Sequence, residues 1–76
     1  MYMVKRPFDL LNVAVGKKVV IGLKGGKEFK GKMLAFDVHM NVVLENAETK
    51  NGEESITYKT IFIRGDSLVY LSPLEE

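Results

Sequence analysis

The chain has 76 residues, of which 46% are hydrophobic and 28% are charged, and it contains no cysteine. The length excludes a second domain, and the absence of cysteine excludes a disulfide framework. A single histidine, His39, also excludes a zinc cluster of the usual Cys and His ligands. Association between subunits therefore remains the way to stabilise the thin core of so small a domain. The net charge of +1 indicates no partner, but residues 1–32 hold eight basic and two acidic residues (+6), and residues 33–76 hold three basic and eight acidic residues (−5), which could give one basic and one acidic surface.

The sequence contains no segment that would direct it to a membrane. No run approaches the roughly 20 apolar residues that a membrane span requires. The N-terminal stretch MYMVKRPFDLL has two basic residues but no long apolar block, so it is not typical of a signal peptide. The absence of cysteine fits a reducing compartment. We therefore expect a soluble, cytoplasmic protein.

A short helix is predicted over residues 7–15. Pro7 suits the first helical position, Asp9 lies in the first turn where the helix dipole favours an anion, and Gly16 is typical of a helix end. A helix of about two turns is unstable alone, so it must lie on the rest of the domain. Its expected apolar stripe consists of Phe8, Leu10, Leu11 and Val15.

After this helix the hydrophobic period becomes two, which indicates strands. Gly25-Gly26 and Asn51-Gly52 predict tight turns, and Gly31 inside a strand predicts a sharp bend or bulge. Because the connections are short, neighbouring strands should be antiparallel. The predicted strands cover about 18–24, 28–37, 41–48, 54–63 and 68–72. The fold class is therefore mainly β, a single domain over residues 1–76 in which a short N-terminal α-helix lies on a five-stranded, strongly bent antiparallel sheet, a small open barrel.

Two strands carry further predictions. Alternation places Phe29, Gly31, Met33 and Ala35 on one face of the second strand. The last strand, Leu68–Leu71, has no charge, proline or glycine, and such an edge tends to pair with another chain. A head-to-tail strand contact that repeats with a closing rotation makes a ring. The alternative is that the helix covers this edge.

Two polar segments at strand junctions, residues 37–41 and 64–66, have the composition of a base-binding pocket. The flat side chains of His39 and Arg64 can stack on the two faces of a nucleobase, and the Asn41 amide offers a donor and an acceptor to a pyrimidine edge. Nearby carboxylates could hold Asn41 or Arg64 in place.

Each of these residues also has a simpler interpretation. His39 fits an ordinary loop histidine, and Asp37 and Asn41 are common turn formers. Arg64 and Asp66 could form a surface ion pair that contributes little stability. In the same simpler interpretation Gly65 relieves backbone strain and Met40 fills the core.

Taken in order, the residues form two recognisable motifs. The stretch Gly26-x-x-Phe29-x-Gly31-x-Met33-x-x-Phe36-Asp37-x-His39-Met40-Asn41-Val42-x-Leu44 resembles the first Sm motif, with Met33 where leucine or valine is frequent. The stretch Ile61-Phe62-Ile63-Arg64-Gly65-Asp66-x-Leu68-Val69-x-Leu71 resembles the second. The chain is thus similar to the Sm and Sm-like (Lsm) family over residues 7–73. It is most similar to archaeal Sm-like proteins, because the Lys-His pair of the bacterial branch, Hfq, is absent.

The resemblance implies a function and a set of site residues. Family members form rings of six or seven subunits, joined by pairing of the fourth strand with the fifth, and bind uridine-rich single-stranded RNA at the central pore. For this chain the resemblance implies a homo-oligomer, preferably a homoheptamer, that acts as a scaffold or chaperone in RNA processing and ribonucleoprotein assembly. By similarity His39 and Arg64 would sandwich a uracil, Asn41 would read its edge, Gly65 and Asp66 would shape the pocket, and Asp37 and Met40 would support it.

Two other functions stay open at this point. The ring could be a structural or protein-interaction module in which RNA binding is incidental. A small enzyme, such as a nuclease that relies on His39, is the other possibility, but the sequence has no G-x-S-x-G, P-loop or H-E-x-x-H motif. We therefore predict a protein that is not an enzyme and that has no cofactor and no metal site.

Overall fold

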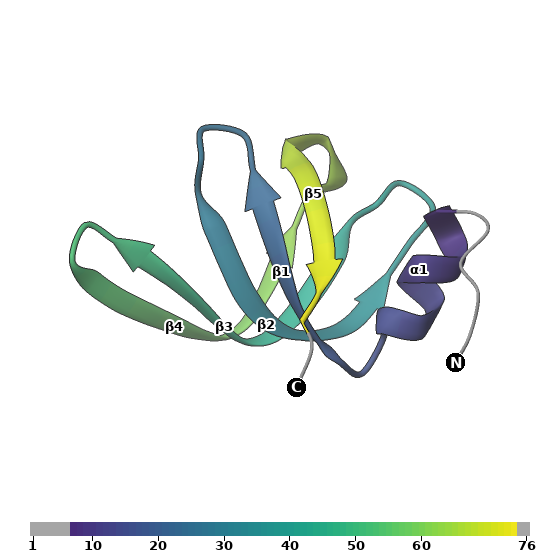
Figure 1. Ribbon diagram of the computed structural model, residues 1–76, viewed down its shortest axis with the longest axis horizontal. Coiled ribbons are helices and arrows are strands. Elements are labelled where there is room, and N and C mark those ends of the chain that lie inside the picture. The colour runs from purple at the N-terminus through teal and green to yellow at the C-terminus, as the bar shows by residue number, and fades with distance from the viewer. Residues whose placement is uncertain (1–6, 75–76) are drawn as a thin grey trace.

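The protein is a strongly bent five-stranded sheet with one helix beside it, as the computed structural model shows for the described residues 7–74 (Figure 1). All neighbouring strands are antiparallel, in the order β4-β3-β2-β1-β5. The predicted fold class is confirmed. The elements are α1 (Pro7–Ala14), β1 (Lys18–Leu23), β2 (Glu28–Phe36), β3 (Val42–Asn51), β4 (Glu54–Ile63), the 3₁₀ turn η1 (Gly65–Ser67) and β5 (Leu68–Pro73).

The helix ends where a left-handed residue turns the chain into the sheet. Gly16 has φ of +86°, which a residue without a Cβ adopts at little cost. Its N–H donates to the Met33 carbonyl at 2.7 Å, and the Met33 N–H donates to the Lys17 carbonyl at 2.9 Å. These two bonds fix the end of α1 to the middle of β2. No helix within residues 7–74 has the length and apolar character to cross a membrane.

The buried face of α1 is narrower than the sequence predicts. Leu11 and Ala14 are buried, whereas Phe8 is 42% exposed and Val15, which lies past the helix end, is 41% exposed. Phe8 contacts the edge of the Phe36 ring with a centroid distance of 5.2 Å. The expected stripe was too wide because it assumed that every apolar residue of so short a helix faces the sheet.

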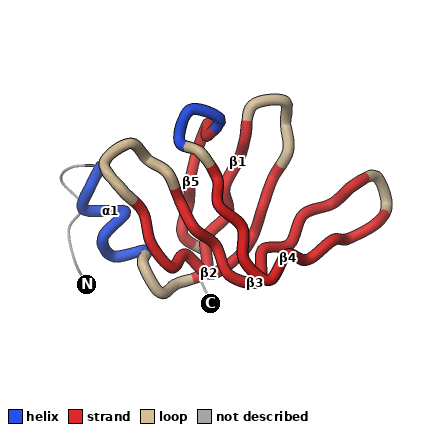
Figure 2. The backbone as a smooth tube through the Cα atoms, turned by 180° about the vertical axis from the view of Figure 1, so that it is seen from behind, coloured by secondary structure: helices blue, strands red, loops and turns tan. Residues whose placement is uncertain are grey.

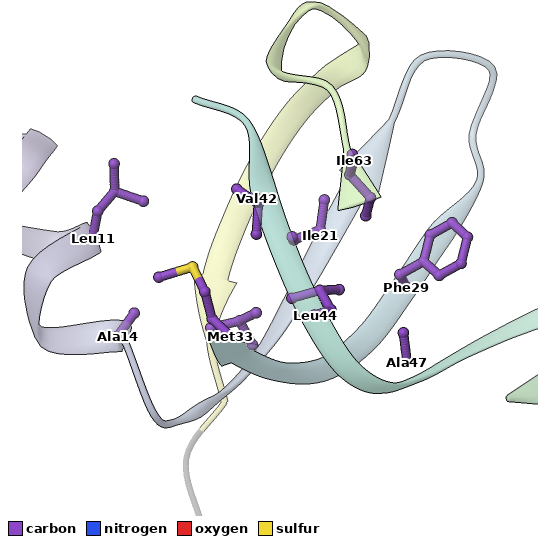
Figure 3. Packing of buried hydrophobic residues seen from close by; sticks show 10 residues of the cluster. Leu11, Ala14, Ile21, Phe29, Met33, Val42, Leu44, Ala47 and Ile63 are labelled. Carbon is purple, nitrogen blue, oxygen red and sulfur yellow. The ribbon is translucent and has the colours of Figure 1, made fainter. Parts of the chain in front are cut away.

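The core lies inside the bend of the sheet, between the strands and α1 (Figure 3). Burying a large aliphatic or aromatic side chain stabilises a fold by about 1.5–3 kcal/mol. Most of the cluster comes from the first three strands, so these strands hold the domain together. Its buried members are Leu11, Ala14, Val19, Ile21, Phe29, Met33, Val42, Leu44, Ala47 and Ile63.

A β-bulge lies at the position of Gly31. Strand β3 places two residues opposite this glycine, and one of them, Asn46, has a left-handed φ of +53°. A Cβ added to Gly31 would lie 3.0 Å from the Ala47 Cα, which is closer than carbon atoms normally approach. The prediction of a bend or bulge at this glycine is confirmed.

A second irregularity changes which side chains of β2 face the core. The β2–β3 register shifts between Met33 and Ala35, and Leu34 is the extra residue. As a result Ala35 is exposed, and Phe36 packs against the core. The predicted face is therefore wrong at Ala35, because a one-residue shift moves every later side chain to the opposite face.

The β3–β4 hairpin is longer than predicted and extends away from the rest of the sheet (Figures 1 and 2). The third strand was expected to end near residue 48, but the ladder continues to the Asn51–Glu54 pair, where Gly52 turns the chain with φ of +68°. The buried Thr49 hydroxyl donates to the Glu28 carbonyl at 2.5 Å, which ties this extension to β2. The polar sequence of residues 49–51 gave no apolar alternation from which to predict the extension.

Strands β4 and β5 are the two edge strands of the sheet, and the outer side of each has no partner strand within residues 7–74. Both edges expose large apolar side chains: Phe62 on β4 is 60% exposed and Val69 on β5 is 61% exposed. Figure 1 shows α1 beside the β2–β3 turn, so the helix does not cover β5. The alternative in which the helix protects this edge is therefore excluded.

Candidate nucleic-acid interface

The two polar segments singled out in the sequence meet in space. The β2–β3 turn carries residues 37–41, and the β4–β5 turn carries residues 64–66. The Gly65 N–H donates to the Asn41 Oδ1 at 2.8 Å. A Cβ on Gly65 would collide with the His39 carbonyl oxygen, so only glycine allows this approach of the two backbones. One site is therefore built from segments 24 residues apart in the chain.

The carboxylate of Asp37 organises the first of these turns. Its Oδ1 accepts hydrogen bonds from the His39 N–H at 2.9 Å and the Asn41 N–H at 3.1 Å, and its Oδ2 accepts one from the Asn41 Nδ2 at 3.0 Å. The Met40 N–H donates to the Asp37 carbonyl, and Met40 itself has a left-handed φ of +67°. Three bonds to one carboxylate thus hold a turn that contains a strained, non-glycine residue.

The amide of Asn41 is fixed at both of its ends. Asp37 accepts from its nitrogen, and the Gly65 N–H donates to its oxygen, so these bonds assign the orientation of the amide. A side-chain amide has two N–H donors and two acceptor lone pairs. One donor and one lone pair therefore remain for a ligand on a group that is held at both ends. The edge of a uracil offers an acceptor and a donor that can pair with them.

Arg64 and His39 are the two exposed flat cationic or aromatic groups of the site. The Arg64 Nη2 lies 2.9 Å from the Asp66 Oδ2, and the two side chains are 74% and 64% exposed. An ion pair so exposed contributes little stability, which agrees with the simpler interpretation of this pair. Asp66 nevertheless contacts the guanidinium of Arg64 at its edge, and this contact leaves the faces of the guanidinium open to solvent. His39 is also exposed.

The structure thus brings together all seven residues that the sequence singled out. Asp37, His39, Met40 and Asn41 share one turn, and Gly65 connects them to Arg64 and Asp66. Their roles toward RNA stay predictions. The sequence did not indicate that Met40 adopts a left-handed conformation, although the turn-forming Asp37 and Asn41 around it were a signal for a tight turn. Within residues 7–74, no three His, Cys, Asp or Glu side chains gather in the manner of metal ligands.

Acid should loosen the 37–41 turn. The Asn41 side-chain hydrogen bond is the main cause that lowers the pKa of Asp37 below its ordinary value of 3.8; desolvation raises it, and the two backbone N–H bonds lower it further. Because the folded pKa is the lower one, the stabilisation is complete above pH 3.8 and is lost as the pH falls through the folded value. Carbon-13 NMR of the Asp37 carboxyl should give a pKa below 3.8 that rises in Asn41→Ala. A value of 3.8 or above in the unmodified protein would contradict this geometry.

Comparison with known proteins identifies the family. The family model described as the LSM domain matches residues 9–73. A Methanosarcina acetivorans relative, named as an snRNP Sm-like protein, is 46% identical over 72 residues, which cover 93% of this chain and 100% of that protein.

Two solved structures have the same fold. The Pyrococcus abyssi Sm protein, solved in complex with a uridine heptamer, is similar with a TM-score of 0.85 at 39% identity, covering 92% of this chain and 100% of that one. The SmAP1 heptamer of P. aerophilum has a TM-score of 0.88 at 27% identity, covering 97% and 100%. These findings confirm the resemblance that the two motifs indicated. The chain belongs to the LSM-domain family of Sm-like proteins.

Proposed function

We propose that this protein is the subunit of a homo-oligomeric ring, preferably a heptamer, that binds uridine-rich single-stranded RNA. The rigid Asn41 amide between Asp37 and Gly65 is the observation that carries the proposal. Its free donor and acceptor match the edge of a uracil, and the exposed side chains of His39 and Arg64 would supply the stacking surfaces. Similarity to a Sm protein solved with a uridine heptamer supports the same ligand.

The two free edges of the sheet support the ring. The apolar side chains Phe62 on β4 and Val69 on β5 are more than half exposed in the single chain, and such edges are a liability unless another copy covers them. Pairing β4 of one copy with β5 of the next is a head-to-tail contact, which closes into a ring when the rotation fits. Heptameric relatives support a heptamer for this chain.

The ring explains why a weak pocket in each subunit is sufficient. Stacking contributes about 1–3 kcal/mol per base, which gives little affinity to one isolated nucleotide. Linked nucleotides that bind successive subunits gain affinity through effective concentration. In this proposal the protein is a non-catalytic scaffold or chaperone in RNA processing and ribonucleoprotein assembly, and it works in the cytoplasm.

Binding of two homopolymers tests this function. We expect the purified protein to bind oligouridine at least tenfold more tightly than oligoadenosine of equal length, because the proposed pocket places a uracil edge against the Asn41 amide. Fluorescence anisotropy measures both affinities, and native mass spectrometry with and without oligouridine gives the number of subunits and bound strands. Equal affinities, or no binding, would favour the alternative of a structural or protein-interaction ring. Hydrolysis of RNA that disappears in His39→Ala would instead support the enzyme.

A further inference from the structure

An open groove lies away from the proposed uracil pocket. It has a volume of about 730 Å³ and is here called the lysine groove. Its lining residues come from the α1–β1 connection, from β1, β2 and β3, and from Leu74 just after β5. The η1 turn lies at the opposite end of β5 (Figure 1). The charged and polar lining of the groove comes mainly from Lys17, Lys18, Lys32, Glu45 and Asn46, and Leu74 closes one side.

The arrangement of lysines in this groove is unfavourable for the fold alone. Lys18 and Lys32 are directly opposite each other in the β1–β2 ladder, where facing Cβ atoms lie about 4.5–5.5 Å apart and like charges are destabilising. Neither lysine forms an ion pair with a carboxylate within residues 7–74. Among the described residues that line the groove, Glu45, opposite Lys32 on β3, is the one acid. Within residues 7–74 the lining therefore places two facing lysines beside a single acid.

The bulge opposite Gly31 adds a neutral hydrogen-bonding group to this positive lining. Asn46 is the left-handed residue of that bulge, and its exposed side chain lines the groove. Bulges commonly redirect a side chain at a functional site. Lysine ammonium groups with an amide beside them are suited to a phosphate diester, because ammonium donors position a phosphate and the amide donates without adding charge. The described part of the lining has no flat stacking surface, so base recognition is not expected there.

We propose that the lysine groove binds the phosphate backbone of RNA that extends beyond the uracil pockets. This inference rests on the proposed function and deepens it, because it assigns a second, sequence-independent contact on the same ring. Lys18 begins β1, and the η1 turn that follows Arg64 lies at the other end of the β1–β5 ladder. Strands of six residues place such ends on the order of 15–20 Å apart. A short strand that fills the pockets does not need the groove, and a longer strand that leaves them can reach it.

A double variant separates the two contacts. Lys18→Ala with Lys32→Ala should leave the affinity for a uridine heptamer within twofold of the unmodified ring. The affinity for a uridine strand about three times as long should fall roughly three- to tenfold, and the slope of log K against log salt should become about 1 smaller. Anisotropy titrations at several salt concentrations give both quantities. Because the variant removes a like-charge pair, its melting temperature should not fall.

Lys27→Ala with Lys50→Ala is the matched control, since it removes the same charge from exposed positions outside the lysine groove and outside the two edge strands. Equal losses in the two double variants would mean that total charge alone acts, and the groove inference would be wrong. Unchanged binding of the longer strand would also overturn it, and this is the result expected if the groove serves an acidic protein. If the unmodified ring binds neither strand, the proposed function itself fails. If the ring binds the uridine heptamer and the groove variant binds the longer strand as tightly as the unmodified ring does, only the groove inference is wrong.

Discussion

Val69→Pro should convert the ring into monomers. Proline removes a backbone N–H donor and is tolerated only where no ladder bond is needed. Within one chain, Val69 has no partner residue on β1, because the β1–β5 register shifts between Gly22 and Leu23 at this position. The fold of the single chain should therefore survive, and the strand contact between copies should be lost. Native mass spectrometry should change from an assembly to the single 8.6 kDa chain, with an unchanged far-ultraviolet circular dichroism spectrum.

Two further variants show whether the edge or the fold is affected. Val69→Ala keeps the N–H and should keep the assembly. Phe62→Glu places a charge on the opposite edge, where the side chain is 60% exposed in the single chain, and it should also give folded monomers. If the mass stays that of the assembly in both Val69→Pro and Phe62→Glu, the subunits do not join through these edges.

Asn41→Ala should abolish most of the preference for uridine. The substitution removes the donor and acceptor that would face the base, and a specific base contact discriminates by about 1–3 kcal/mol. The ratio of oligouridine to oligoadenosine affinity should therefore fall at least tenfold. Because Asn41 also accepts from Gly65 and donates to Asp37, its loss leaves a backbone N–H without its acceptor and lowers affinity for both strands. The ratio of the two affinities, rather than either affinity alone, shows whether Asn41 recognises the uracil edge.

Arg64→Ala is the matched control for this experiment. It removes a stacking face that accepts any base, so both affinities should fall by similar factors and the preference should remain. The ring should stay assembled, because the side chain is largely exposed and its only ion pair among residues 7–74 is with Asp66. An Asn41→Ala protein whose two affinities fall equally would contradict a reading role for Asn41.

Local signals in the sequence were sufficient for most of the fold. Pro7 and Gly16 bound the helix, Gly25 and Gly52 take the positive φ that their turns require, and Gly31 lies at the bend. Each of these positions depends on the conformation of one residue and its neighbours, which is the kind of information that a sequence states directly.

What the sequence could not give depends on contacts between distant segments. The extra residues Leu34 and Asn46 change the register because of how β2 and β3 pair, and no local pattern marks a bulged residue that is not glycine. In the same way, the seven site residues could be named from two motifs, but the bond between Asn41 and Gly65 joins turns that only the folded sheet brings together. Composition suggested a pocket, and tertiary structure determines its rigidity.

The strand order has a mechanical consequence for the proposed ring. Strands β4 and β5 are consecutive in the chain, yet they occupy opposite edges of the sheet, and only the short 64–67 segment joins them. In a closed ring each copy would therefore hold one neighbour with the strand before this segment and the other neighbour with the strand after it. A force on either subunit contact would act directly on Arg64 and Gly65. Binding of RNA in the pockets should therefore make the ring more rigid. A weakened contact between subunits should first appear as a lower affinity for the base.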